Sequence, residues 1–295
     1  MKKALKLIIL LSISIPISLN GQNGILKMFW IQKDKRNFKN LTKFISQKDF
    51  TINNFKSQIK SLSIDNENQI WKKSRKIQAV QYGGLISNWI TIATYDDKIF
   101  SIEIVISGED AEVMKRLAKR NRKINLELKK NWKYSKEIDL DKNIIESFKY
   151  VFIDEKIKSQ FENEIAKDLG QINEIEINDD LKESYEILID PMKNYDYGYS
   201  CYYGAIKPDG RKAIEKILEA KRFDLLKNII RGFNPEGRAY GIEAFFIAYS
   251  KNKYIISKED EDCIKKILKS NISINKCSGC DVFSSSYDEI FPSIN

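Results

Sequence analysis

The sequence predicts an α+β fold, with N-terminal helices packed on a small antiparallel sheet and a C-terminal stack of α-helical hairpins. Apolar residues alternate with period two between residues 77 and 107, and they recur at helical spacing on both sides of that segment. Several helix-start signals then crowd the last third of the chain. We therefore expect an α+β domain at residues 22–195 and a disulfide-stapled helical domain at residues 196–295.

Residues 1–21 are expected to form a cleavable secretory signal peptide. A basic start of three lysines precedes an apolar run from Leu5 to Leu19, and the small residue Gly21 stands where a signal peptidase would cut. The run is shorter than the about 20 apolar residues that a membrane-spanning helix needs, although a retained N-terminal anchor is the alternative. We expect an exported protein of the periplasm or the cell exterior, with no transmembrane segment in the mature chain.

Composition excludes several kinds of catalytic site. The 295 residues include no histidine, so the chain can hold no Ser-His-Asp triad, no Cys-His dyad and no HExxH zinc site. No glycine-rich phosphate loop is present, and the acidic segments that begin like calcium loops lack the required glycine. The net charge of +9 falls to +6 when the three N-terminal lysines are removed. A charge of this size favours anionic partners only as a nonspecific tendency.

The first elements are expected to be helices, because residues 23 to about 75 show weak helical periodicity. The clearest strands follow, where isoleucines alternate with other residues from Ile86 to Ile106 on both sides of Asp96-Asp97. Alternation on both sides of a short acidic turn is typical of a β-hairpin. The segment Ile77–Tyr82, bounded by two glycines, is expected to add a third strand.

Helices are expected again after the hairpin. Leu117 and Ile124 lie near one face of the segment from Glu109 to Trp132, which we predict to be one amphipathic helix. Residues 141 to about 168 show similar spacing and are also predicted to be helical. Residues 170 to 200 contain an acidic, interrupted stretch and are expected to connect the two parts.

The C-terminal third carries the signals of four helices. The third helix start is the strongest, because Asn234 is a capping residue, Pro235 suits the first helical position and Glu236 places an acid in the first turn. The four expected helices begin at Asp209, Phe223, Asn234 and Ser257.

The segment around these helices resembles a HEAT-type helical-repeat unit. Asp224–Ile230 corresponds to a short first helix, and Asn234-Pro235-Glu236-Gly237-Arg238-Ala239 corresponds to the Asn-Pro turn and the Arg-bearing second helix. The resemblance covers Phe223 to Ser270 and at most two units, whereas independent arrays usually need about three or more. A hairpin stack of the same shape without kinship is the alternative. HEAT-type units are usually binding scaffolds, so the resemblance implies interaction rather than catalysis.

All four cysteines, Cys201, Cys263, Cys277 and Cys280, fall in the expected helical domain. An even number in an exported chain favours disulfides, and we expect a crosslink from Cys201 to the C-x-x-C turn at residues 277–280. The motif has two other interpretations, a zinc site with Cys201 or Cys263 and redox catalysis. A redox motif normally opens a helix after a strand. Here a helix is expected before the motif, and a strand or loop is expected at Asp281–Phe283.

Five tyrosines crowd nine residues around the first cysteine. A tyrosine ring combines a flat apolar face with a hydrogen-bonding tip, which suits the surface of a sugar or a peptide. The alternative is that alternate rings pack on the helices and cover their edge. These candidate binding residues are Tyr195, Tyr197, Tyr199, Tyr202 and Tyr203.

The predicted helix after the hairpin is very basic, with ten Lys or Arg and one acid between Lys115 and Lys136. A basic amphipathic helix can bind phosphate-rich surfaces, and an exported protein would meet lipid headgroups or cell-wall polymer. The alternative is a solvated face balanced by the acidic stretch at residues 174–186. The candidate binding residues of this helix are Arg116, Arg120 and Lys123.

Together these observations predict a non-enzymatic binding or interaction module of the bacterial envelope. We expect its partner to be a protein or an envelope polymer rather than a specific nucleic acid, and we expect no cofactor, metal ion or catalytic residue. The alternatives are an enzyme, either a thiol-disulfide exchanger or a carboxylate-based glycan hydrolase, and one member of a toxin–immunity pair.

Overall fold

The computed structural model describes residues 19–45, 51–58, 63–81, 85–128, 131–139, 144–251 and 254–292. The predicted signal peptide lies outside these ranges except for Leu19–Gly21, which belong to the first turn of α2 (Leu19–Ile45). None of the helices within the described ranges combines the length and the apolar character that crossing a membrane requires.

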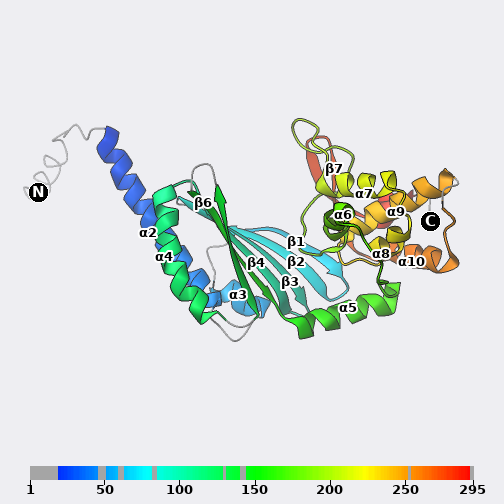
Figure 1. Cartoon of the computed structure of the whole chain (residues 1–295), viewed down its shortest axis with the longest axis horizontal. Coiled ribbons are helices and arrows are strands. Elements are labelled where there is room, and N and C mark those ends of the chain that lie inside the picture. The colour runs from blue at the N-terminus through cyan, green and yellow to red at the C-terminus, as the bar shows by residue number, and fades with distance from the viewer. Residues whose placement is uncertain are drawn as a thin grey trace, which may run out of the picture.

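The structure confirms the α+β fold. Helices α2, α3 (Ile52–Gln58) and α4 (Ala111–Glu127) lie on one side of a six-stranded antiparallel sheet (Figure 1), whose strand order is β1-β2-β3-β4-β6-β5. The strands are β1 (Ser63–Trp71), β2 (Ser74–Gln81), β3 (Ile86–Tyr95), β4 (Lys98–Gly108), β5 (Trp132–Asp139) and β6 (Ile144–Ile153). A second, mostly helical part lies beside β1 and β2.

The β3–β4 hairpin forms where the alternation predicts it. Its two-residue turn is Asp96-Asp97, whose φ angles of 50° and 61° are left-handed, as a type I′ turn requires at both central positions. The expected third strand is β2, although Tyr82 lies outside the described residues. A register shift near the turn places Ile99 in the core under the helices and its neighbour Phe100 in the core of the helical part.

The first hydrophobic core lies between the three helices and the sheet. Alternate residues of the central strands point into this core and meet apolar side chains of the helices. Burying one such side chain contributes about 1.5–3 kcal/mol, and a slip of one residue would turn a whole strand's apolar set to solvent. The core therefore also fixes the strand register. Its fully buried members include Leu41, Phe44, Ile92, Ile102, Ile104, Met114 and Phe148.

Three sequence predictions for this part are wrong. β1 occupies the end of the segment expected to be helical, β5 begins at Trp132 where a helix was expected to end, and β6 replaces the start of the helix expected at residues 141–168. The spacing of four between Phe148 and Phe152 fits a strand as well as a helix, and the buried Tyr150 between them shows period two. β1 is a polar edge strand held by its pairing with β2, which local periodicity does not report.

The second part consists of helices and one small hairpin. Two of its elements correct the sequence prediction: α6 lies within the expected connection, and a strand, β7, runs into the C-x-x-C turn and contains its first cysteine. α5 and α6 pack into the second hydrophobic core although both precede residue 196. The elements are α5 (Glu155–Leu169), α6 (Asp179–Ile189), α7 (Asp209–Glu219), α8 (Asp224–Ile230), α9 (Pro235–Ser250), α10 (Lys258–Leu268), β7 (Ser273–Ser278), β8 (Asp281–Ser286) and α11 (Tyr287–Ile290).

The four predicted helix starts are confirmed to within one residue. Asn234 Oδ1 accepts a hydrogen bond from the Gly237 amide at 3.0 Å, and Ser257 Oγ accepts one from the Asp260 amide at 3.2 Å. α9 then passes so close to α6 that a Cβ atom on Gly237 would collide with the carbonyl of Leu188. Glycine is therefore required at this crossing.

Arg238 of α9 joins the helical part to the sheet. Its side chain is fully buried, and its Nη1 and Nε atoms donate to the carbonyls of Ile70 in β1 at 3.0 Å and of Gly232 at 2.8 Å. Its guanidinium carbon lies 4.8 Å from the centre of the Trp71 ring. The Trp71 indole in turn donates to Asp168 of α5 at 3.0 Å. Two buried carbonyls and an aromatic ring from both parts thus converge on one side chain.

We expect Arg238→Ala to lower the free energy of unfolding by about 3–5 kcal/mol, because two buried carbonyls lose their donor and a cavity remains. Urea unfolding followed by circular dichroism measures this loss. Arg75→Ala is the matched control, since Arg75 is an exposed sheet residue that pairs with Glu67 at 3.3 Å, and it should change the value by less than about 0.5 kcal/mol. Equal losses in the two variants would contradict the role given to Arg238.

Candidate functional site

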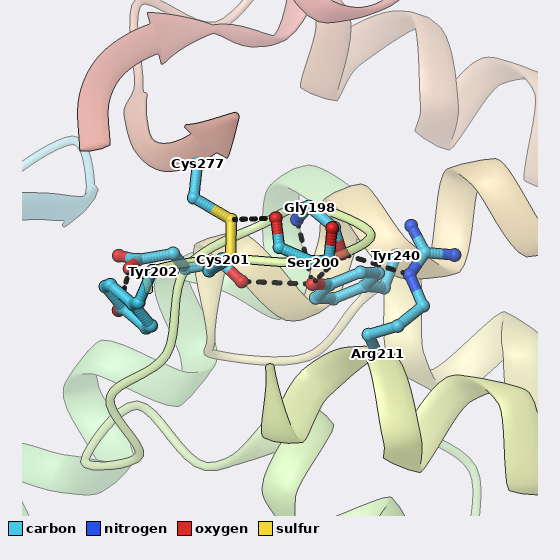
Figure 2. The surroundings of a disulfide bond; sticks show 8 residues. Gly198, Ser200, Cys201, Tyr202, Arg211, Tyr240 and Cys277 are labelled. Carbon is cyan, nitrogen blue, oxygen red and sulfur yellow. Dashed lines mark hydrogen bonds between the residues drawn. A yellow bond between two sulfur atoms is a disulfide. The ribbon is translucent and has the colours of Figure 1, made fainter. Parts of the chain in front are cut away.

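A disulfide joins the tyrosine-rich loop between α6 and α7 to β7. Cys201 and Cys277 are bonded, with their Cα atoms 5.6 Å apart (Figure 2), which confirms the expected crosslink from Cys201 to the C-x-x-C turn. The other two cysteines are free thiols, Cys263 buried in α10 and Cys280 exposed in the β7–β8 turn. Within the described part of the chain, no group of three or more Cys, Asp or Glu side chains could hold a metal ion.

The loop runs beside β7 as an additional extended segment. The Tyr197 amide donates to the carbonyl of Asn275 at 2.7 Å, and the Cys277 amide donates back to the carbonyl of Tyr197 at 2.9 Å. Further along, the Tyr202 amide donates to the carbonyl of Gly279 at 2.7 Å. These backbone hydrogen bonds and the disulfide hold the loop and the hairpin as one unit.

A buried ion pair supports the loop from below. Both Nη atoms of Arg211 in α7 donate to the carboxylate of Glu243 in α9, at 3.0 and 2.7 Å, and Arg211 Nε donates to the carbonyl of Gly198 at 3.1 Å. The hydroxyls of Tyr197 and Tyr199 donate to the same carboxylate at 2.9 and 2.6 Å. Bidentate, charge-assisted hydrogen bonds are strong and fix orientation, so this cluster ties the loop to two helices.

Burial and Glu243 both raise the pKa of these two tyrosines. The hydrogen bond to Glu243 is the main cause that raises the pKa of Tyr199. Burial, and after it the charge of Glu243, raises the pKa of Tyr197. Neither hydroxyl loses its proton near neutral pH, so neither can act as a general base there. The cluster ties the loop to α7 and α9.

Gly198 is the point where the loop contacts the disulfide. Its amide donates to the hydroxyl of Tyr240 at 2.9 Å, and that hydroxyl donates to the carbonyl of Asp196 at 3.0 Å. Figure 2 shows Tyr240 and Arg211 beneath the loop. A Cβ atom on Gly198 would collide with the sulfur of Cys277, so the close approach of loop and disulfide requires glycine.

The loop and the hairpin expose a cluster of large hydrophobic side chains, which we call the apolar tip. The two segments project together from the helical part near β7 (Figure 1). Of the ten large hydrophobic side chains exposed in the described part of the chain, six belong to this tip, and Tyr203 is 94% exposed. Exposed apolar clusters on a fixed backbone are typical of interaction sites. The six members are Tyr199, Tyr202, Tyr203, Ile206, Val282 and Phe283.

The predicted tyrosine run divides between core and surface. Tyr195 and Tyr197 are buried, with ring centres 6.1 and 4.8 Å from that of Tyr240, whereas the three later tyrosines lie on the apolar tip. Sequence reasoning did not single out Ile206, Val282 or Phe283, nor the Arg211–Glu243 pair. The only signal for the hairpin members was the strand or loop expected at residues 281–283.

The basic candidates lie away from the apolar tip. Arg116 and Arg120 are on the exposed side of α4, in the sheet part of the molecule (Figure 1), and the side chain of Lys123 lies outside the described part. The prediction that one helix carries the basic residues from Lys115 to Lys136 is wrong, because Lys133 and Lys136 belong to β5. The structure therefore does not bring the two sets of candidates together.

Comparison of the chain with protein-family models, with curated proteins and with solved structures finds no match.

Alkylation without reduction distinguishes the two free thiols. Burial raises the pKa of Cys263 to about 11, and only the thiolate reacts. We expect the native protein at mildly alkaline pH to take up one alkyl group, at the exposed Cys280, and the denatured, unreduced protein to take up two. Intact mass and peptide mapping report the sites. Uptake of four groups by the denatured protein would show that the disulfide is absent.

We expect Glu243→Gln to loosen the loop and to lower the free energy of unfolding by about 3–5 kcal/mol, because Arg211 would keep a buried charge without a counter-ion. Hydrogen exchange should become faster at the amides of Tyr197 and Tyr202. Glu215→Gln is the matched control, since Glu215 pairs with the exposed Lys207 at 2.7 Å. Unchanged exchange in Glu243→Gln would show that the ion pair does not support the loop.

Proposed function

We propose that this protein is a non-enzymatic binding module that engages a partner protein through the apolar tip. The observation that carries the proposal is that one disulfide-held projection bears six exposed large hydrophobic side chains. Exposed apolar clusters mark interaction sites. A surface that is already fixed before binding loses less conformational entropy when the complex forms, which favours affinity.

Hydrogen bonding at the tip favours a protein groove over a polysaccharide. The hydroxyl of Tyr199 donates to Glu243, and the hydroxyl of Tyr202 donates to Asp196. The tip therefore presents mainly ring faces and aliphatic carbon to a partner. A sugar polymer carries many hydroxyls that need hydrogen-bonding partners, whereas an apolar groove in a protein needs buried apolar contact. Because the tip projects outward (Figure 1), it suits insertion into such a groove.

Three further observations support an interaction module of the bacterial envelope. The N-terminal sequence has the order of a signal peptide, and the Cys201–Cys277 disulfide fits an oxidising compartment, where such bonds persist. The resemblance of Phe223–Ser270 to HEAT-type units, which are usually scaffolds for binding, points in the same direction.

Thiol–disulfide exchange is the second candidate function, and the exposed thiol of Cys280 favours it. Attack of the Cys280 thiolate on the sulfur of Cys277 would form a Cys277–Cys280 disulfide and release Cys201 as a thiolate. We rank this candidate second because it gives no role to the six hydrophobic side chains of the tip. The described residues give the other enzymatic alternative, a carboxylate-based glycan hydrolase, no comparable support.

Site-specific photocrosslinking in the producing cells tests the proposed function. A benzophenone side chain at position 203 should form a discrete adduct with one partner protein, and Phe283→Ser should reduce its yield by about tenfold or more, as expected for loss of a central apolar contact. The matched position is Tyr249, an exposed tyrosine of α9 outside the tip, which should give no such adduct.

The outcomes separate the proposed partner classes. A discrete protein adduct that depends on Phe283 supports the proposal. An adduct formed equally from positions 203 and 249 contradicts it, as does the absence of any adduct. Recovery of the position-203 adduct only with insoluble cell-wall material would replace the partner protein by an envelope polymer.

A further inference from the structure

A cavity of about 180 Å³ is lined by residues of α2 and α4 and by Ile86 at the start of β3. These helices lie far from the apolar tip (Figure 1). The walls of the cavity are mainly aliphatic. A cavity of about 150 Å³ in another protein holds one benzene molecule, so this volume suits a small apolar group rather than a long acyl chain. The aliphatic walls are formed by Ile31, Ile86, Val113 and Leu117.

A buried carboxylate also lines the cavity. Asp34 of α2 is only 4% exposed, and its Oδ2 atom accepts a hydrogen bond from the Leu85 amide at 2.9 Å. Its Oδ1 atom has no hydrogen-bond partner in the described part of the protein. A buried carboxylate oxygen without a partner is costly. Asp34 thus brings a buried carboxylate to the wall of the cavity, and a cationic donor is its best complement.

Basic side chains line the same cavity on the side of α4. Arg116 and Arg120 are four residues apart and so lie on one face of the helix. Arg116 pairs with Glu112 at 3.4 Å, and Arg120 makes no ion pair with the described residues. Lys35 adds a third basic side chain from α2. The cavity thus combines an acceptor for a cation, donors for an anion and aliphatic walls.

Two buried amides show that this helix layer has further unused hydrogen-bonding capacity. Asn121 of α4 is fully buried, and neither atom of its amide group has a partner among the described residues. Asn37 of α2 is also buried, and its Nδ2 atom is likewise without a partner there. Asn37 lies one helical turn beyond Asp34, and Asn121 one turn beyond Leu117. Neither side chain lines the cavity, so these two amides do not define its ligand.

We propose that this cavity binds an α-amino acid with an aliphatic side chain, either free or as the first residue of a peptide. The α-ammonium group would donate to Asp34, the aliphatic side chain would fill the space among the apolar walls, and the carboxylate or first peptide carbonyl would accept from Arg120 and Arg116. An apolar anion would bring no donor to Asp34, and an apolar amine would bring no acceptor to Arg120. A zwitterion satisfies both ends. This site is separate from the apolar tip and does not depend on its function.

Calorimetric titration of the whole protein with L-leucine and two truncated analogues tests the proposal. Isocaproate lacks the ammonium group and isoamylamine lacks the carboxylate, so each should bind about tenfold or more weakly than leucine, as expected for loss of a charged hydrogen bond. Leucyl-glycine distinguishes a peptide N-terminus from a free amino acid as the ligand. Tighter binding than that of leucine identifies the peptide N-terminus, and weaker binding identifies the free amino acid. These titrations use the unmodified protein and so do not depend on whether a variant folds.

Variants that remove one charge show which side chain of the cavity contacts each end of the ligand. Asp34→Asn should weaken leucine binding by about tenfold or more and leave isocaproate binding unchanged or tighter. Arg120→Gln should weaken leucine binding and leave isoamylamine binding unchanged. Arg122→Gln, at an exposed position of α4 that does not line the cavity, is the matched control and should bind leucine normally. Absence of leucine binding at millimolar concentration, or isocaproate binding as tight as that of leucine, would overturn the proposal.

Discussion

The arrangement of the whole molecule depends on the buried guanidinium of Arg238, which connects the helical part to the sheet and which we call the joint. An arginine can serve here because its planar fork reaches two carbonyls at once while its face lies over Trp71. The carbonyls belong to β1 and to the turn before α9, so the sheet and the helices share one donor. Trp71 extends the joint to Asp168 at the end of α5, and Lys76 of β2 adds a hydrogen bond to the carbonyl of Lys193 at 3.0 Å. The joint thus sets how the helical part sits against the sheet edge.

A second buried arginine works differently, and the difference matters for function. Arg211 is neutralised by the carboxylate of Glu243, which also accepts from two tyrosines. The cluster therefore has its hydrogen-bonding capacity used inside the protein, and it holds the loop from below while the disulfide holds it from the side. Apolar side chains on a loop that is fixed on two sides cannot fold back onto the core. Their exposure is a consequence of this support, and the proposed binding role follows from that exposure.

The two proposed binding regions differ in chemistry and in position. The six side chains of the apolar tip carry no charge and belong to a projection of the helical part, whereas the cavity between α2 and α4 is lined by charges of both signs and belongs to the sheet part. The first suits an apolar groove of another protein, and the second suits a small zwitterion. The basic residues Arg116 and Arg120, which the sequence suggests as contacts for a phosphate-rich surface, take another role in this proposal, since the structure sets them across a cavity from Asp34.

Local patterns in the sequence were sufficient to predict the α+β class, the β3–β4 hairpin and the four helix starts after residue 208. These features depend on local periodicity, capping and turn chemistry, which neighbouring residues encode. The same patterns did not predict β1, β5 and β6, because pairing with a neighbouring strand stabilises these segments. In addition, a spacing of four residues, such as that between Phe148 and Phe152, fits both the helical period and the strand period. Tertiary structure alone decided which tyrosines are exposed, which cysteines stay free and which atom of Asp34 lacks a partner. Burial and hydrogen bonding depend on residues that are far apart in the chain, and no local pattern records them.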